Sequence, residues 1–489
     1  MYLGLDLGTS SVKAVVINAD GQPLAQATAP VSVSRPKPGW SEHDPADWVS
    51  ATDRVMSALA QDHGQLMGAV EAVGLSGQMH SATVMDASDR VLRPCMLWND
   101  GRAQAECALL ERLAPDLRTL TGNQAMAGFT APKLLWMREH EPDLFRQVAT
   151  VLLPKDYLRW HLSGEKASDM SDSAGTLWLD VGHRAWSPVL LDACGMSVSQ
   201  MPRLVEGTEV SATLRADLAA KWGLRSGIPI AGGGGDNAAG AVGMGVVTPG
   251  TAFVSLGTSG VVFAVSDGFR PDPGKGLHAF CHALPDTWHQ MTVVLSAAAC
   301  VDWAARLVGF DDAGAFTTAA DTAIPERCPI FLPYLTGERT PHSDSAARGV
   351  FFGLDPETGP AEIAYSVLEG VSFGLVDGVD VMRGAGTDPE SFTVIGGGAR
   401  SSVWGRIIAA AMARPMIYRS LGEVGPALGA ARLAQIAATG SDPAMVATPP
   451  KEESRIEPDA AMTDRLAPRL ERFRGLYTAL KPSFDAAYG

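Results

Sequence analysis

The sequence predicts an α/β protein with more than one domain, and three observations lead to that prediction. The chain has 489 residues, so at roughly 150 residues per domain it leaves two large domains or three ordinary ones open. Hydrophobic residues make up 46% of the chain and charged residues 19%, a globular balance that can fill two large cores. Leu7-Gly8-Thr9-Ser10 recurs half a chain later as Leu256-Gly257-Thr258-Ser259, each time between apolar runs. A four-residue match alone is weak evidence for a duplication, but both copies lie between apolar runs, and this shared context favours two related halves.

The first elements show how the α/β pattern starts. Alternating apolar residues and turn chemistry predict three antiparallel strands at residues 3–6, 12–18 and 24–34. A helix at residues 47–59 and a buried strand at residues 70–76 are expected to follow. Asp44 is the expected cap of that helix, with Pro45 in its first turn. Strands, a helix and a further strand in this order indicate a mixed sheet covered by helices.

Charge and composition exclude several kinds of partner. Thirty-nine Lys and Arg residues against 54 Asp and Glu give a net charge of −15, without the basic patch that nucleic-acid binding requires. The uncharged stretch 237–266 could be mistaken for a membrane span, but Pro249 and many glycines favour buried strands and turns. We therefore expect neither a nucleic-acid nor a membrane partner. No basic lead precedes an apolar run at the N-terminus, so a cytoplasmic location is expected. The oligomeric state stays open, with a homodimer among the alternatives.

The repeated Gly-Thr-Ser turns carry the first functional signal. Backbone N–H groups in such a turn point together and form a concave anion site, to which the hydroxyls add donors. One isolated copy is more simply an ordinary hairpin turn. Two copies, together with the glycine triplet Gly396-Gly397-Gly398 and two Ala- and Gly-rich helical segments, favour phosphate binding. Gly274-Lys275-Gly276 lacks the hydroxyl that follows the lysine in a P-loop, so Lys275 is expected in a solvated loop.

Two acids stand beside these glycines. Asp6 ends the first strand just before the turn, where a carboxylate can hold Mg²⁺ through waters; a turn-stabilising role is the alternative. Asp236 follows four glycines, residues 232–235, that allow close approach of a ligand. There it can accept the proton of a hydroxyl that attacks phosphorus, whereas the alternative is a capping residue for the next helix.

In order along the chain, these features resemble the superfamily of sugar kinases, Hsp70 and actin. The resemblance implies the actin-like ATPase fold, which is ribonuclease H-like, with two related domains and ATP in the cleft between them. It places the domains at residues 1–245 and 246–489. Residues 2–18 and 251–265 match the two phosphate motifs, and residues 394–401 match the adenosine motif. Residues 236–245 and 425–437 match the two interdomain helices.

Longer segments narrow the resemblance to the FGGY carbohydrate kinases. Residues 128–136, and 349–354 followed by 362–370, look like the two signatures of that family. Further segments are similar to those of family members that phosphorylate xylulose: residues 77–80, 97–102, 153–158 and 168–172. The resemblance implies ATP-dependent phosphorylation of D-xylulose at its terminal hydroxyl, giving D-xylulose 5-phosphate and ADP in D-xylose catabolism. Ser81 departs from the pattern, because a glycine is usual there, and Gly232 lengthens the glycine run.

The resemblance also assigns roles to single residues. Asp236 is the general base. Asp6 helps to hold Mg²⁺ at the end of the site where the phosphates of ATP bind. The sugar contacts it implies are Met79, His80, Asp100 and Asn237. The residues facing the phosphates of ATP are Gly8, Thr9, Ser10, Ser11 and Lys13 in the first turn and Gly257, Thr258 and Ser259 in the second. The residues along the adenosine are Gly396, Gly397, Gly398, Ala399 and Arg400.

Two alternative functions stay open. One is a related kinase for another ketose or polyol, such as ribulose or glycerol. The other is an Hsp70- or actin-like ATPase, which shares the phosphate motifs but has no need for the segments 77–80 and 98–102. A sugar-dependent release of ADP separates the two classes.

Four remaining patterns have structural interpretations. Six cysteines without a C-x-x-C pair argue against zinc knuckles and disulfides. His278 and His282 fall on one face of an expected hairpin strand near His289, which favours a packed or a surface face over metal binding. Lys133 is expected to start an amphipathic helix that runs to Leu144, and residues 447–464 a solvated connection before the last helix.

Overall fold

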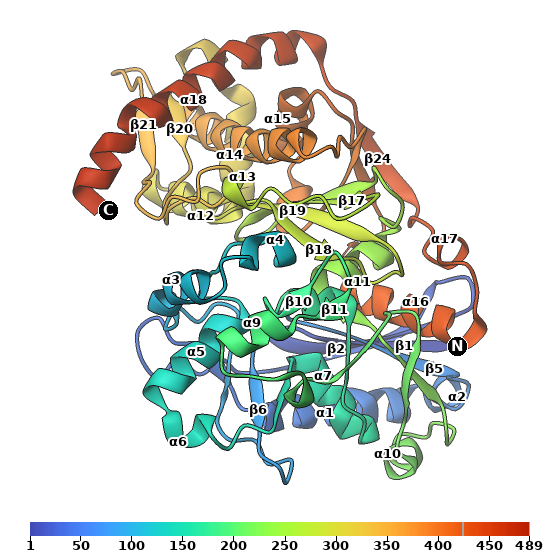
Figure 1. Ribbon diagram of the computed structural model, residues 1–489. Coiled ribbons are helices and arrows are strands. Elements are labelled where there is room, and N and C mark those ends of the chain that lie inside the picture. Colours follow the sequence, from blue (N-terminus) through green and yellow to red (C-terminus); the bar gives the residue numbers. More distant parts are fainter. Residues whose placement is uncertain (423–424, 489) are drawn as a thin grey trace.

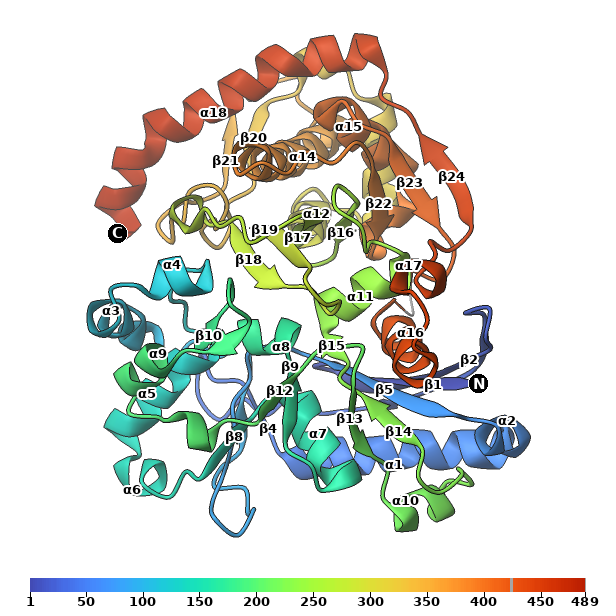
Figure 2. The same cartoon turned by 45° about the vertical axis from the view of Figure 1, so that its right-hand side comes forward.

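The computed structural model describes residues 1–422 and 425–488, and a large mixed β-sheet lies in each half of the chain. Figures 1 and 2 show the two sheets at the centres of two lobes, with helices covering them and the long α18 (Ala460–Tyr488) lying over the second lobe. The predicted α/β class and the pair of related halves are confirmed.

The first sheet grows from a hairpin at the N-terminus. β1 (Tyr2–Leu7) pairs antiparallel with β2 (Ser11–Ile17), which pairs with β3 (Pro23–Pro30), and β5 (Ala72–Gly77) runs parallel to β1. β14 (Pro229–Ala231), β13 (Val210–Thr213) and the short β15 (Gly234–Gly235) extend the sheet beyond β5. Because β1, β5 and β15 are parallel, their carboxyl ends meet at one edge.

Further helices and small strand pairs complete this half of the chain, some packed on the sheet and others around a separate hydrophobic core beside it. α1 (Pro45–Asp62) is capped as predicted: Asp44 Oδ1 accepts a hydrogen bond from Ala46 N at 2.9 Å. α5 (Thr130–His140) ends before Leu144, and α6 (Pro142–Phe145) follows, because a residue before proline disfavours helical backbone. The single helix predicted through Leu144 is therefore wrong. The other helices are α2 (Gly64–Gly68), α3 (Gln104–Leu113), α4 (Leu117–Thr121), α7 (Pro154–Ser163), α8 (Met170–Ala174), α9 (Pro188–Ala193) and α10 (Ala216–Lys221). The small pairs are β4 (Glu42–His43) with β7 (Cys95–Met96), β6 (Thr83–Met85) with β8 (Thr150–Leu152), β9 (Ala167–Asp169) with β12 (Arg203–Val205), and β10 (Leu179–Asp180) with β11 (Ala185–Trp186).

The second sheet repeats the same start. β16 (Ala252–Leu256) and β17 (Gly260–Ser266) form a hairpin, β19 (Trp288–Val294) and β18 (His278–Cys281) continue it, and β22 (Phe392–Ile395) runs parallel to β16. β23 (Met416–Arg419) and β24 (Glu452–Ile456) complete the other side. The remaining elements of this lobe are α12 (Ala298–Leu307), α13 (Ala313–Ala319), α14 (Pro360–Gly384), α15 (Ser402–Met412), β20 (Ile330–Leu332) and β21 (Val350–Phe352).

β24 corrects one expectation. It lies inside the segment 447–464 that the sequence presents as a solvated connection, and α17 (Pro443–Val446) precedes that segment. Glu452 to Arg455 are exposed, yet the strand pairs antiparallel with β23. An edge strand with charged side chains resists further pairing, and its composition therefore resembles that of a loop.

Two small-residue helices cross between the lobes. α11 (Asp236–Met244) and α16 (Gly425–Thr439) contact each other backbone to backbone, since a Cβ added to Gly429 would lie 1.7 Å from Ala239 O. α16 also lies directly on the first sheet, where a Cβ on Gly4 would lie 1.9 Å from Ala427 O. A helix of the second half thus packs on the sheet of the first half, as Figure 2 shows beside β1. The stretch 237–266 forms α11, β16 and β17, and within the ranges that the structure describes no helix combines the length and apolar character needed to cross a membrane.

Candidate active site

Two acids occupy the edge at which the parallel strands of the first sheet end. Asp6 lies on β1 level with Ser76 on β5, and Gly234 on β15 is level with the same serine. Asp236 is the first residue of α11, directly after β15. The fold therefore brings Asp6 and Asp236 to one edge, although 230 positions apart in numbering.

The carboxylate of Asp236 is held by its neighbour. Its Oδ1 accepts hydrogen bonds from Asn237 N at 2.7 Å and from Asn237 Nδ2 at 3.0 Å. Gly235, not Asp236, is the N-cap of α11, so the capping alternative from the sequence is wrong. With Oδ1 engaged in this way, Oδ2 is the oxygen that can accept a proton from a bound hydroxyl.

Burial and mutual repulsion tune both acids. Burial first, and then the negative charge of Asp6, raise the pKa of Asp236 to about 7. Burial raises the pKa of Asp6 to about 6, against the opposing effects of the Ser76 hydroxyl and the Lys13 ammonium. A carboxylate with a pKa near 7 is well matched to accept a proton at neutral pH.

This pair of acids fits a hydrated divalent cation. Asp6 Oδ1 is buried and accepts no hydrogen bond from a described residue. A nearby cation would satisfy that oxygen and relieve the repulsion between the two carboxylates. In the described ranges, no three His, Cys, Asp or Glu side chains cluster closely enough to hold a bare ion. Mg²⁺ needs fewer protein ligands, because it keeps much of its water.

His80 lies in the turn that follows β5 and has the left-handed φ of +70°. Its Nδ1 donates to the carbonyl oxygen of Gly175 at 2.8 Å, which leaves Nε2 as a hydrogen-bond acceptor. The ring packs edge-on against Phe129, with centroids 4.6 Å apart. Burial lowers the pKa of His80 to about 3, so the ring is neutral. The ring therefore offers a bound ligand one fixed acceptor.

The other predicted sugar contacts differ in their surroundings. A Cβ added to Gly235 would lie 2.8 Å from Met79 Cγ, which places Met79 directly beside the residue before Asp236. Asn237 is engaged with Asp236, as described above. Asp100 is buried, and its two oxygens accept from Ser41 N at 2.7 Å and from Arg102 Nε and Nη2 at 2.8 and 2.6 Å. The structure thus brings Met79 and Asn237 to Asp236, while both oxygens of Asp100 are engaged by Arg102 and Ser41.

In each Gly-Thr-Ser turn the glycine N–H closes the hairpin, across residues 8–11 in the first turn and the shorter 257–259 in the second. Gly8 N donates to Ser11 O at 3.0 Å, and Gly257 N donates to Ser259 O at 3.1 Å. The first turn is fixed by side chains, since Thr9 Oγ1 accepts from Trp98 Nε1 at 2.9 Å. The second is fixed by the start of α12, since Ala297 N donates to Thr258 O at 2.9 Å. Neither Gly8 nor Gly257 has a positive φ. If glycine is required at either position, the reason is therefore the room around the residue and not its backbone conformation.

The third predicted ATP segment lies at the end of β22. Gly396 has a φ of +87°, and a Cβ on Gly398 would lie 2.6 Å from the ring of Trp404. A cavity of about 800 Å³ opens here, between the two lobes. Its lining includes Gly396, Gly397, Ala399 and Arg400 together with residues 23–26 of β3 and 418–422 after β23. Its size suits a nucleoside.

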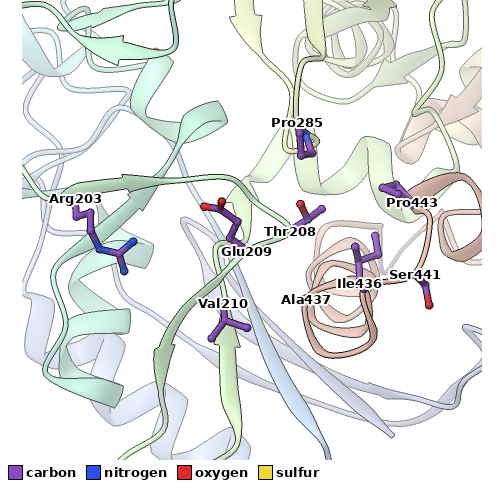
Figure 3. A pocket seen from close by; sticks show the side chains of 10 residues that line it. Arg203, Thr208, Glu209, Val210, Pro285, Ile436, Ala437, Ser441 and Pro443 are labelled. Atoms are coloured by element: carbon purple, nitrogen blue, oxygen red, sulfur yellow. The ribbon is translucent and has the colours of Figure 1, made fainter.

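A second cavity, of about 640 Å³, lies elsewhere. Figure 3 shows Thr208 and Glu209 before β13 facing Pro285 and the end of α16 at Ile436. None of the residues predicted from the sequence to bind substrate or ATP lines it. It therefore takes no part in the site described above.

Two family models match most of the chain, and both belong to one family of enzymes. The model of the N-terminal domain of the FGGY family of carbohydrate kinases matches residues 1–243, and that of its C-terminal domain matches residues 252–438. The chain belongs to the FGGY family of carbohydrate kinases. It is 53% identical to the xylulose kinase of Escherichia coli (strain K12) and 50% identical to that of Klebsiella pneumoniae, over 99% of each chain. A solved structure of a xyloylose kinase from Brucella ovis superposes with a TM-score of 0.96 at 50% identity, covering 98% of this chain and 99% of that one.

Family membership decides between the alternatives left by the sequence. A carbohydrate kinase replaces the Hsp70- or actin-like ATPase as the class of protein. The histidines that raised a metal interpretation are buried on β18 and in the turn and strand beside it, as the packing interpretation expected. Lys275 is 58% exposed and pairs with Asp272, which confirms its position in a solvated loop.

Several residues that support the site carry no sequence signal of their own. Ser171 Oγ accepts from Gly235 N at 3.0 Å and so fixes the residue before Asp236. Its loop is anchored by Lys155, whose buried Nζ contacts Asp156, Asp169 and Asp172 at 2.6, 2.8 and 3.2 Å. The family-like segments 153–158 and 168–172 marked this region, but the cluster itself appears only in the fold.

Lys133 supports His80 in a similar way. Its buried Nζ donates to the carbonyl oxygens of Ala127 and Phe129 at 3.1 and 3.0 Å. Thr130 Oγ1 donates to His80 O at 2.8 Å, and Phe129 packs on the His80 ring. The structural role expected for Lys133 is thus to hold the loop against which His80 packs.

Proposed function

We propose that this carbohydrate kinase transfers the γ-phosphoryl group of ATP to the terminal hydroxyl of D-xylulose, giving D-xylulose 5-phosphate and ADP. The observation that carries the proposal is Asp236, with Oδ1 held by Asn237 and a pKa of about 7, beside Met79 at the edge where His80 also lies. The xylulose kinases that share half or more of its residues over nearly the full length support D-xylulose as the sugar.

In the proposed reaction, the terminal oxygen of the sugar attacks the γ-phosphorus, and the bond between that phosphorus and the bridging oxygen of ADP breaks. Asp236 Oδ2 takes the hydroxyl proton as the new bond forms. Asn237 keeps the carboxylate in one orientation throughout, since its two donors stay on Oδ1. Near neutral pH this acid can release the proton again between turnovers.

His80 and Met79 orient the sugar. The neutral ring accepts a hydrogen bond at Nε2 from a hydroxyl of the matching configuration, while its Nδ1 stays on Gly175. A pentulose with that hydroxyl inverted would leave the buried nitrogen unpaired, which costs binding energy. Asp100 contributes in this proposal by holding the 97–102 loop through Arg102.

The phosphates of ATP are proposed to lie between the two turns, Gly8 to Ser11 with Lys13 and Gly257 to Ser259, with the adenosine in the cavity along Gly396 to Arg400. Asp6 would hold Mg²⁺ through waters, and the bound ion would neutralise charge on the phosphate oxygens. The backbone N–H groups of the turns donate to the same oxygens. We place the domain boundary at residues 245 and 246, between α11 and the second hairpin.

The test is a coupled assay of ADP release over a small panel of sugars. The proposal predicts a kcat/KM for D-xylulose about 10²-fold or more above that for D-ribulose and glycerol. A higher value for D-ribulose or glycerol would make the chain a related kinase with another substrate. ADP release that does not depend on any sugar would contradict the proposal altogether.

A further inference from the structure

Arg339 is a cation near His80 to which the mechanism above gives no role. It lies in the segment between β20 and β21, and its side chain is half-buried. Its Nη1 is 3.4 Å from His278 Nε2 on β18. The segment is rigidly held, because Thr340 Oγ1 donates to Gly276 O at 2.9 Å and Thr340 N donates to Val293 O at 3.2 Å. The backbone that carries Arg339 is therefore fixed in place.

Its charge has no counterion. Across residues 1–422 and 425–488, no carboxylate forms an ion pair with this guanidinium. Three other arginines with buried guanidinium groups have such partners: Arg102 with Asp100, Arg184 with Glu206 and Arg469 with Glu369, each at 2.6 Å. The buried Arg432 donates instead to the carbonyl oxygens of Val242 and Gly243, each at 3.0 Å. A desolvated cation without a partner is costly, and such a group marks a place where an anion is expected.

The adjacent acid does not fill this role. Glu338 Oε1 accepts from the backbone N–H groups of Leu295 and Arg339 at 2.9 and 2.7 Å. Burial raises the pKa of Glu338 to about 8, so the group is largely uncharged at neutral pH. Glu338 thus fixes the backbone of Arg339 without neutralising its side chain.

The position of Arg339 connects the two ends of the site. The segment is fastened to Leu295, and Ala297 two residues later donates to Thr258 of the second Gly-Thr-Ser turn. His278, which the guanidinium contacts, packs on Phe129 with ring centroids 5.9 Å apart. Phe129 in turn packs on His80, and the charge of Arg339 helps to lower the pKa of His80. The guanidinium therefore lies near His80, on a segment that is linked through Glu338 and Leu295 to the second Gly-Thr-Ser turn.

We propose that Arg339 binds the phosphoryl group during its transfer from ATP to the sugar and then the phosphate of the product. The inference rests on the proposed function. D-Xylulose carries no charge, so it cannot neutralise a buried cation, whereas the transferred group is an anion in ATP, at the transition state and in the product. A guanidinium suits this task because it stays protonated and donates two parallel hydrogen bonds to phosphate oxygens. It donates hydrogen bonds only, and the proton of the sugar hydroxyl still goes to Asp236.

The test compares two ligands that differ by one phosphate. Binding of D-xylulose and of D-xylulose 5-phosphate is measured by calorimetry for the wild-type chain and for Arg339→Gln. The variant should bind the phosphate at least about 10-fold more weakly, the loss expected for hydrogen bonds to a charged group, and the free sugar within about 2-fold. Its kcat should fall about 10²-fold or more, because charge stabilisation at the transferred group is lost, with little change in KM for D-xylulose.

Three further variants distinguish a role in binding the phosphoryl group from a purely structural one. Arg339→Lys preserves the charge and should lose less kcat than Arg339→Gln, and it replaces that variant if Arg339→Gln does not fold. Arg348→Ala is the matched control, because Arg348 lies in the same segment and donates only to the carbonyl oxygens of Ser345 and Ala347. Free guanidinium should restore part of the activity of Arg339→Ala, which a purely structural role does not predict.

The outcomes separate this inference from the function it rests on. Equal weakening of both ligands, or no weakening of either, overturns the role of Arg339 and leaves the kinase proposal intact. A wild-type chain that binds neither ligand contradicts the substrate, and the proposal for Arg339 falls with it.

Discussion

The two halves of the molecule begin with the same structure but end their strands with different chemistry. β1, β2 and β5 are arranged like β16, β17 and β22: a hairpin closed by Gly-Thr-Ser, with a third strand parallel to the first. In the first half Asp6 precedes the turn, and in the second half Ser255 occupies the same place. After β5 come Gln78, Met79 and His80, whereas after β22 come three glycines.

This difference shows how the same arrangement of strands can bind a sugar in one half and a nucleotide in the other. The backbone of the turn supplies anion-binding N–H groups in both halves, independent of the side chains around it. The side chains at the strand ends then differ in function between the halves. The acids and the imidazole of the first half suit proton transfer and sugar binding, while the glycines of the second half leave room for a nucleoside. The predictions below test whether the halves differ in this way.

The largest contrast is expected between Asp6 and its counterpart. Asp6→Asn should lower kcat by about 10²-fold or more, because charge stabilisation at the phosphates depends on that carboxylate. Ser255→Ala should change kcat by less than about 3-fold, since no charge is lost. Steady-state kinetics at several Mg²⁺ concentrations would measure both, and equal losses in the two variants would contradict the division between the halves.

His80→Ala should affect the sugar alone. We expect kcat/KM for D-xylulose to fall about 10²-fold, from the cost of unpaired sugar hydroxyls, with KM for ATP nearly unchanged. His183→Ala, at a histidine whose side chain is 85% exposed, is the control. Kinetics on D-xylulose and D-ribulose, with a melting curve, decide the matter: a less stable variant with the same sugar preference would remove His80 from the sugar site.

Replacing the turn glycines should affect the nucleotide. Gly8→Val and Gly257→Val should each weaken ATP binding about 10-fold, because a branched side chain obstructs phosphates that accept backbone hydrogen bonds. A Cβ added to Gly8 would lie 3.2 Å from Ser11 O, and a Cβ added to Gly257 would lie 3.6 Å from Ser259 O. Both variants should therefore fold, and the valine at position 257 should cause the smaller strain. Titration with a fluorescent ATP analogue is the measurement, with circular dichroism as the control; unchanged affinity in both variants would exclude a site between the turns.

The smallest effect is a shift in pH dependence. The pKa of Asp236 is raised to about 7, so kcat/KM should fall tenfold per pH unit below that value as the base becomes protonated. In Asp6→Asn this acidic limb should move to lower pH, because one cause of the raised pKa is gone. A pH profile of residual activity with an unmoved limb would show that the two acids do not interact.

The same raised pKa has a consequence for stability. Asp236 has an ordinary carboxyl pKa near 4 when unfolded and a raised one when folded, so the folded chain binds more protons between about pH 4 and 7. The contribution of this group to the free energy of unfolding therefore decreases as pH rises through that window. The acid thus destabilises the fold at neutral pH, as expected of a functional group in a strained electrostatic environment.

Local signals made most of the fold predictable. The Asp44 cap, the two hairpins and their turns each depend on residues close in sequence, and the structure has them where the patterns place them. β24 was missed because an exposed strand of charged residues has no apolar alternation to reveal it. The packing of α16 on the first sheet follows from glycines on two distant segments, which only the family resemblance connects.

The site was predictable to the extent that its residues follow strands. Asp6, His80 and Asp236 each stand just before or after a turn at a strand end, a pattern visible in sequence. The bond from His80 to Gly175, the bond from Gly235 to Ser171 and the position of Arg339 join residues 61 or more positions apart. Such contacts leave no local pattern, so the free Nε2 of His80 and the unpaired guanidinium appear only in the structure.

The most direct test of the account is single-turnover phosphoryl transfer by Asp236→Asn, with ATP binding measured on the same sample. An amide at this position keeps the shape and can still accept from Asn237 through its oxygen, but it cannot take the hydroxyl proton. The account predicts that transfer to D-xylulose slows by about 10²-fold or more while the affinity for ATP stays within a factor of about 2. A variant that retained more than about a tenth of wild-type transfer would contradict Asp236 as the base.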